Sequence, residues 1–149
     1  MRSPLKLLFL CTGNSCRSQM AEAWARELCG DRFEVFSAGL EPQGIDPRAA
    51  AVMREAGIDI SAARSKHVEE LARVSFDHVI TVCDRAGERC PVFGGQARVT
   101  HVGFDDPPCL ARSARSEEQA LSHYRRVRDE IREFVEKLPE LLEKEGESR

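Results

Sequence analysis

An apolar strand pattern that runs into a short loop and then into a helix constrains this chain more than any other feature. The apolar residues 7–10 end at Cys11, and a loop of small residues follows before a helical pattern begins. Such a junction gathers backbone N–H groups and the positive end of a helix dipole around one point, where a tetrahedral oxyanion can bind. The same field lowers the pKa of a thiol, so Cys11 is predicted to be a nucleophilic thiolate.

The loop after Cys11 also carries an arginine, whose planar guanidinium can contact two oxygens of one anion. The candidate oxyanion-binding residues are Thr12, Gly13, Asn14, Ser15, Cys16, Arg17 and Ser18.

Strand and helix patterns alternate along the rest of the chain. Asp46 with Pro47 predicts the start of a helix that Gly57 closes, Ser116 with Gln119 predicts a capping box, and Pro139 is expected to end or kink the last helix. Strands are predicted at residues 6–11, 33–38, 76–83 and 96–102, and helices at residues 19–28, 47–56, 68–74 and from 116 onward. This order predicts an α/β fold with a four-stranded, doubly wound parallel sheet flanked by helices.

The predicted domain covers residues 1–142 and is followed by a polar tail at 143–149. Cys11 and Cys83 both fall at predicted strand ends. Because ligands of such sheets bind beyond the carboxyl ends of the strands, both cysteines are expected at the functional edge.

Charge and cysteine content narrow the class of protein. A net charge of −3 argues against general nucleic-acid binding, and no apolar stretch approaches the length of a membrane span. No export-signal pattern accompanies the six cysteines, so a reducing cytoplasm is expected. In that compartment, catalysis, redox chemistry or metal binding explains several cysteines better than structural disulfides do.

Four segments together resemble one known group. They are the loop CTGNSCRSQMAE at residues 11–22, the pair Cys83 and Cys90, the run GFDDP at 103–107, and VRDEI at 127–131. These segments resemble the thioredoxin-coupled arsenate reductases, which have the low-molecular-weight tyrosine phosphatase fold. The resemblance extends to about Phe134 and implies reduction of arsenate to arsenite, with phosphate or sulfate as substrate mimics.

The resemblance also assigns roles to individual residues. It implies that Cys11 is the nucleophile, with Arg17 as the anion-binding arginine and Ser18 as the hydroxyl that holds the thiolate. Asp106 becomes the general acid, and Cys83 and Cys90 become the second and third redox cysteines. The implied disulfide passes from Cys11–Cys83 to Cys83–Cys90, which thioredoxin then reduces.

A helical segment would hold the Cα atoms of Cys83 and Cys90 about 10 Å apart, whereas a disulfide needs about 4.4–6.8 Å. The segment between them is therefore expected to rearrange with redox state.

Some members of the group hold potassium beside the loop. The matching positions are Asn14, Glu22 and Ser37, but the fourth position, an aspartate in those members, is Lys66 here. The Lys66 ammonium is therefore expected to stand in for the ion, although a solvated surface lysine is the simpler reading. The resemblance further implies a cytoplasmic monomer with no metal and no tightly bound cofactor.

Other readings of the same residues stay open. The loop fits a tyrosine phosphatase equally well, and three reactive cysteines fit a redox sensor without turnover. Cys83 and Cys90 can be core residues or zinc ligands, and Asp106 can simply form an Asp-Pro turn. Trp24 is expected in the core, Cys16 is expected to pack inward with a minor redox role as the alternative, and Cys29 and Cys109 are expected to be fillers or bystanders.

Overall fold

The computed structural model describes residues 4–82 and 97–147, with side chains described up to residue 142. Its centre is a four-stranded parallel sheet in the order β2-β1-β3-β4. The strands are β1 (Leu5–Cys11), β2 (Phe33–Gly39), β3 (His78–Thr81) and β4 (Arg98–His101). The predicted sheet is confirmed. β1 is central because residues 7–10 are fully buried, as a strand covered on both faces must be.

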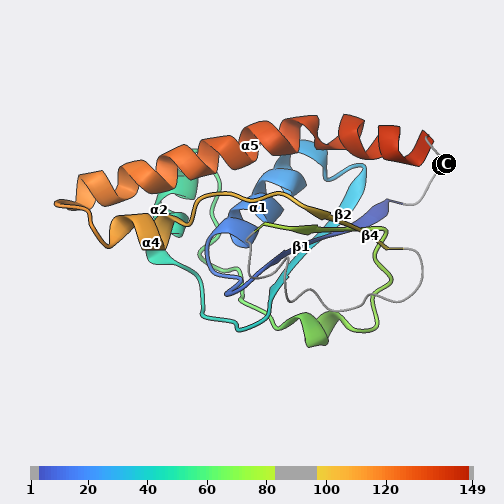
Figure 1. Ribbon diagram of the computed structural model, residues 1–149, viewed down its shortest axis with the longest axis horizontal. Coiled ribbons are helices and arrows are strands. Elements are labelled where there is room, and N and C mark those ends of the chain that lie inside the picture. The colour runs from blue at the N-terminus through green and yellow to red at the C-terminus, as the bar shows by residue number, and fades with distance from the viewer. Residues whose placement is uncertain (1–3, 83–96, 148–149) are drawn as a thin grey trace.

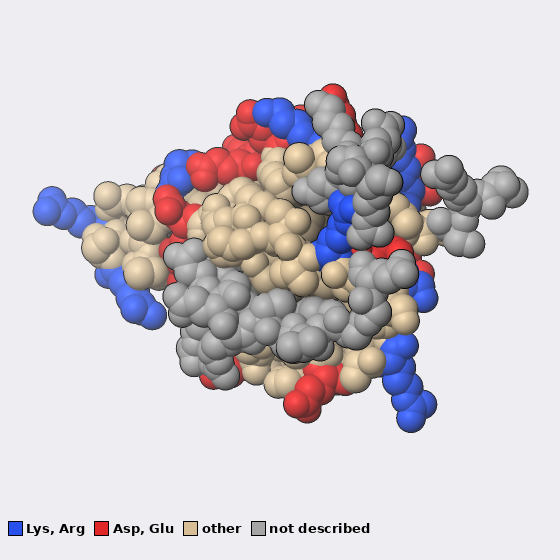
Figure 2. Space-filling view, turned by 45° about the vertical axis from the view of Figure 1, so that its right-hand side comes forward, with Lys and Arg blue, Asp and Glu red and all other residues tan. Residues whose placement is uncertain are grey.

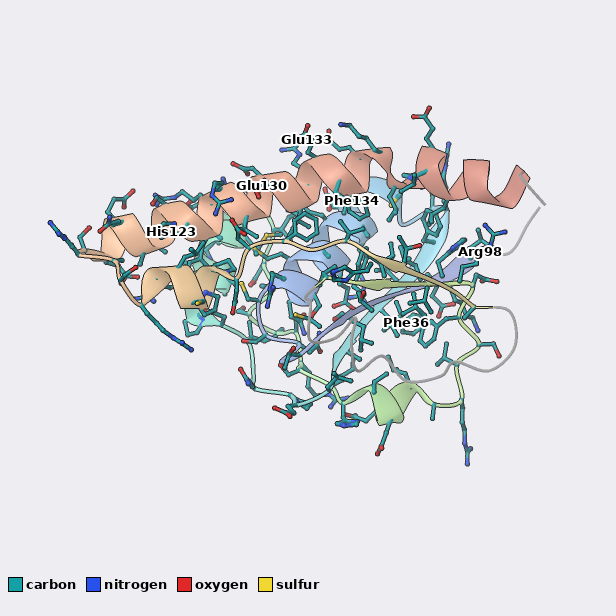
Figure 3. The ribbon with its side chains drawn as sticks, viewed as in Figure 1. Phe36, Arg98, His123, Glu130, Glu133 and Phe134 are labelled. Atoms are coloured by element: carbon teal, nitrogen blue, oxygen red, sulfur yellow. The ribbon has the colours of Figure 1, made fainter. Side chains whose placement is uncertain are left out.

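Helices α1 (Arg17–Cys29), α2 (Pro47–Glu55) and α4 (Pro107–Ala111) all pack against the long helix α5 (Glu117–Glu147). Figure 1 shows α5 running along one side of the molecule above α1, while the short helix η1 (Val68–Leu71) lies on the opposite side of the sheet. The buried stripe of α5 includes the predicted Tyr124 and Ile131. Figure 3 shows Phe134 directed toward the body of the protein and Glu133 directed away from it.

Two of the predicted helix starts can be compared with the hydrogen bonds that the structure shows there. Asp46 caps α2 as predicted, because its Oδ1 accepts hydrogen bonds from the backbone N–H groups of Arg48 and Ala49. The capping box at the start of α5 is only half formed. Gln119 N–H donates to Ser116 Oγ at 3.0 Å, but the Gln119 side chain accepts from Arg115 N–H instead of Ser116 N–H.

Two short helices differ from the predictions. The helix expected at residues 68–74 is the shorter 3₁₀ helix η1, and α4, which follows Asp106, was not predicted. The last helix does not end at Pro139, and it continues to Glu147 through the expected tail. Beyond the proline, α5 is held by tertiary packing, since Leu138 and Leu142 on either side of it are both buried.

Candidate active site

Cys11 is the last residue of β1, and the loop from residue 12 to 16 connects it to the start of α1. Its side chain is buried, with 4% exposed. Pairing of Cys11 with Gly39 on β2, and of the preceding Leu10 with Thr81 on β3, fixes the point where the chain leaves the sheet. The loop therefore starts at the carboxyl edge of the two central strands (Figure 1).

The loop directs its carbonyl groups outward. Four of them accept hydrogen bonds from the chain that follows β2: Cys11 O from Leu40 N, Thr12 O from Glu41 N, Gly13 O from Gln43 N and Ser15 O from Asp46 N, at 3.3, 2.8, 3.0 and 3.1 Å. In a trans peptide the next N–H points the opposite way, and no cis bond occurs among the described residues. The N–H groups of Thr12, Gly13, Asn14 and Cys16 therefore point away from the chain that follows β2, as an oxyanion site inside the loop requires.

Asn14 holds the middle of the loop. Its φ of 46° lies in the left-handed region, which asparagine tolerates better than most residues. The buried side chain donates from Nδ2 to Ser18 Oγ and Ser37 Oγ, both at 2.9 Å, and its Oδ1 accepts from Lys66 N–H at 2.9 Å. Because Ser18 accepts this bond, its own hydroxyl proton is available to a neighbour.

Gly39, where β2 ends, is essential to the loop for steric reasons. A Cβ atom at Gly39 would lie 2.7 Å from Thr12 O and 2.8 Å from Asn14 N, both backbone atoms that cannot move easily. Only glycine therefore allows β2 and the loop to approach this closely. No local pattern identifies Gly39 as a site residue, because a glycine after a strand pattern usually marks only a turn.

Arg17 and Asp106 come together although they lie far apart in sequence. Arg17 Nη2 is 3.6 Å from Asp106 Oδ1, and Arg17 Nη1 donates to Phe104 O at 3.0 Å. The Arg17 side chain is 13% exposed and that of Asp106 45%. Asp106 is the N-cap residue of α4, but its side chain makes no capping hydrogen bond. The carboxyl group of Asp106 therefore lies beside Arg17 and is not engaged at the N-terminus of α4.

Asp105 has a different partner. Its Oδ2 accepts a hydrogen bond from Arg126 Nη2 at 2.9 Å, and Arg126 also binds Glu130 on the same helix. Phe104 packs edge-to-face on Phe134, with 5.9 Å between ring centroids. These contacts fix the segment before α4 to α5 and leave Asp106 as the carboxylate that faces the loop.

Cys16 lies inside the protein, as predicted. It is 5% exposed, and burial together with the nearby Asp46 carboxylate raises the pKa of its thiol well above the ordinary value. The thiol is therefore neutral at physiological pH, which leaves the backbone N–H of Cys16 as the group that it can offer to an anion.

Three of the candidate cation-site side chains form one buried network. Ser37 Oγ donates to Glu22 Oε2 at 3.0 Å and accepts from Asn14, while Arg26 pairs with Glu22 Oε1 at 3.0 Å. Lys66 enters through its backbone, and its Nζ donates to Arg64 O at 3.1 Å. Partial burial is the main cause that lowers the pKa of Lys66, and the Glu22 charge opposes that shift. The four positions therefore meet, with Arg26 as an additional cation at Glu22.

The remaining predicted residues divide into two groups. Trp24 and Cys29 are buried in the core and Cys109 is exposed, as expected for residues outside the chemistry. Cys83 and Cys90 lie outside the described residues. Cys83 directly follows Val82, which is buried just beyond the end of β3.

Basic and acidic side chains are interspersed on the face shown in Figure 2, around a broad uncharged area. Within the described part of the chain, no helix has both the length and the apolar character needed to cross a membrane. In the same residues, no three His, Cys, Asp or Glu side chains are placed to hold a metal ion.

Comparison with known proteins agrees with this geometry. The family model described as low molecular weight phosphotyrosine protein phosphatase matches residues 6–148. An arsenate reductase of Bacillus licheniformis is 46% identical over 134 residues, which cover 90% of this chain and 94% of that protein. An arsenate reductase structure in the oxidized state superposes with a TM-score of 0.74 at 35% identity, covering 89% of this chain and 95% of that one.

A second arsenate reductase structure, in the phosphate binding state, has a TM-score of 0.71 at 34% identity and covers 90% of this chain and 95% of that chain. The expected resemblance is confirmed. The chain belongs to the low molecular weight phosphotyrosine protein phosphatase family and, within it, lies among relatives that are arsenate reductases.

Proposed function

We propose that this protein reduces arsenate to arsenite and so serves arsenic detoxification. The observation that carries the proposal is the placement of Cys11 at the mouth of a loop whose N–H groups face inward, with Arg17 and Asp106 at its edge. Backbone donors recognise a tetrahedral shape and a charge, which arsenate and phosphate share. Relatives that are arsenate reductases, one of them in a phosphate binding state, support this choice of anion.

The first step forms a bond between sulfur and arsenic. The Cys11 thiolate attacks arsenate and displaces one oxygen, which Asp106 protonates so that it leaves as water. Arg17 and the loop N–H groups hold the remaining oxygens and their negative charge. Ser18, whose proton is available, stabilises the thiolate before attack.

The second step supplies two electrons. The Cys83 thiolate attacks the Cys11 sulfur and forms a Cys11–Cys83 disulfide, and the electron pair of the sulfur–arsenic bond stays on arsenic, which leaves as arsenite. The Cys90 thiolate then attacks the Cys83 sulfur and releases Cys11 as a thiolate. A dithiol of the thioredoxin type reduces the resulting Cys83–Cys90 disulfide and itself becomes oxidised. No tightly bound cofactor is needed, and we propose that the chain works as a cytoplasmic monomer.

Arsenate-dependent NADPH consumption with thioredoxin and thioredoxin reductase tests the whole sequence. We expect steady turnover for the wild type and none for Cys83→Ser. Cys90→Ser is expected to release about one equivalent of arsenite and then stop. The exposed Cys109 provides the matched control, since Cys109→Ser should keep full turnover. Sustained turnover of Cys90→Ser would refute the relay.

A weak phosphatase activity is the second candidate, because the family model is that of phosphotyrosine phosphatases. The shared nucleophile, arginine and acid can transfer a phosphoryl group to water without the other cysteines. Two aromatic residues that could stack on phosphotyrosine are otherwise engaged, since Trp24 is buried and Tyr124 is bound to Asp46. We therefore expect slow hydrolysis of p-nitrophenyl phosphate that Cys83→Ser leaves unchanged.

We also propose that cations of the chain replace potassium beside the loop. The Lys66 ammonium lies close enough to Glu22 for that charge to oppose the lowering of its pKa, and Arg26 pairs with the same carboxylate. Wild-type activity should therefore be insensitive to an exchange of sodium for potassium, whereas Lys66→Asp should become potassium-dependent. The variant Lys66→Met removes the positive charge without adding a carboxylate, so it separates these two effects of Lys66→Asp. Strong potassium dependence of the wild type would contradict the proposal.

A further inference from the structure

The second half of the oxyanion loop rests on one residue, Asp46, that the proposed chemistry does not use. Asp46 N–H donates to Ser15 O at 3.1 Å, which orients the peptide group between Ser15 and Cys16. The Asp46 Oδ1 atom is occupied by the N-terminus of α2, where Arg48 N–H and Ala49 N–H donate at 2.9 and 3.4 Å. Asp46 therefore connects the loop to α2 and has its second carboxylate oxygen left for another partner.

That partner is a tyrosine from the far end of the sequence. Tyr124 OH donates to Asp46 Oδ2 at 2.7 Å, and the residue is 1% exposed. Burial and the Asp46 charge both raise the pKa of Tyr124, which keeps the hydroxyl protonated and able to donate. Arg48 directs two nitrogens to Glu117 at 3.0 Å and also interacts with the Tyr124 hydroxyl, which lowers the pKa of Tyr124 less than burial and Asp46 raise it. The Asp46 carboxylate itself accepts hydrogen bonds from the Tyr124 hydroxyl and from the N-terminus of α2.

The two halves of the loop consequently differ in how they are supported. Asn14 is held by several side chains, and its backbone carbonyl oxygen accepts a hydrogen bond from Gln19 Nε2 at 3.2 Å. The Ser15–Cys16 peptide depends on Asp46, whose orientation depends on Tyr124. We propose that Tyr124 is a positioning residue for the oxyanion loop, acting from α5 through Asp46 to aim the Cys16 N–H at the bound anion.

This inference rests on the proposed function, because it requires an oxyanion in the loop. Removal of the hydroxyl would leave Asp46 Oδ2, on a partly buried side chain, without this donor. The carboxylate would then turn to find water or another donor, and the Ser15 carbonyl would turn with the Asp46 backbone. The Cys16 N–H, on the other side of the same peptide, would lose its direction, so anion affinity should fall while the helix packing around the tyrosine ring remains.

The test is calorimetric titration of the reduced protein with inorganic phosphate. Tyr124→Phe keeps the ring and is expected to weaken phosphate binding by about fivefold to tenfold. Ile131→Val is the matched control, since Ile131 is buried on the same helix and loses one methyl-sized group, and its phosphate affinity should equal that of the wild type.

A double-mutant cycle separates positioning from general packing. Serine caps helices well but is too short to reach the tyrosine, so Asp46→Ser keeps the α2 cap and removes the connection. Tyr124→Phe should then add no further loss of phosphate affinity in the Asp46→Ser background. Equal affinity of Tyr124→Phe and wild type, or additive losses in the double variant, would overturn the inference. Absence of phosphate binding by the wild type would instead refute the proposed function, and the inference with it.

Discussion

Two segments meet at Arg17, namely the oxyanion loop that precedes it and the segment before α4 that contacts its side chain. They are held in place by different kinds of interaction. The oxyanion loop is fixed by buried hydrogen bonds, in which Asn14 and Ser18 are both fully buried. The segment before α4 is attached by the Asp105–Arg126 pair, whose side chains are 64% and 43% exposed, and by the packing of Phe104 on Phe134.

The buried loop and the more exposed segment before α4 are suited to different tasks. A hydrogen bond lost at Asn14 or Ser18 leaves a buried polar atom without a partner, which costs more than the loss of an exposed bond does. The loop is therefore suited to keep a fixed geometry for an anion. Asp106, partly exposed and close to Arg17, is suited to adjust its position when Arg17 turns toward a substrate.

The largest effect is expected at the acid itself. Asp106→Asn keeps the size of the side chain but removes the proton donor, so kcat for arsenate should fall about 100-fold or more. Asp105→Asn is the neighbouring control and should stay within about threefold of wild type, because its partner is a surface arginine on α5. Steady-state arsenate reduction measures both. A larger loss of kcat in Asp105→Asn than in Asp106→Asn would show that Asp106 is not the acid.

Substitutions in the oxyanion loop should lower the free energy of unfolding more than substitutions at the exposed ion pairs of α5. Asn14→Ala removes three side-chain hydrogen bonds, two of them buried, and keeps a side chain at positive φ, so the free energy of unfolding should fall by about 3 kcal/mol. Asn14→Gly loses the same bonds but relieves the backbone, and it should recover about 1 kcal/mol. Urea unfolding of both variants measures the difference. Wild-type stability in either variant would contradict a rigid loop.

A smaller effect should appear at alkaline pH. Folding raises the pKa of Cys16, so the folded protein keeps a proton that the unfolded chain loses above about pH 8.5. The contribution of this thiol is fully present below that pH and declines as pH rises toward the folded pKa. The free energy of unfolding should therefore fall more steeply with pH in the wild type than in Cys16→Ser. Parallel pH profiles of the two proteins would exclude this role of the thiol.

The smallest effect is expected for the Asp105–Arg126 ion pair, which attaches the segment before α4 to α5. Arg126→Ala should cost less than about 1 kcal/mol, and raised salt should reduce the loss further, because the ion pair is exposed. Lys137→Ala, at another exposed pair on α5, provides the reference. A loss in Arg126→Ala as large as that in Asn14→Ala would remove the distinction between the two segments.

Much of the fold could be read from local patterns. Continuous apolar runs marked β1 and β3, and Asp46 with Pro47 marked the start of α2, because burial and capping leave traces in neighbouring residues. The helix through Pro139 could not be read this way. The proline removes one backbone hydrogen bond, but burial of Leu138 and Leu142 holds the helix on the body of the protein, and that contact is not local.

The sequence by itself predicted the candidate nucleophile and the anion loop, and it determined the order of the strands, since each depends on residues close together in the chain. Only the tertiary structure showed that Asp106 lies beside Arg17 while Asp105 pairs with Arg126, required Gly39 to be a glycine, and joined Tyr124 to the loop through Asp46. These relations link residues up to 89 positions apart, as Arg17 and Asp106 are (106 − 17 = 89). Such contacts follow from how the elements pack, and no spacing along the chain encodes them.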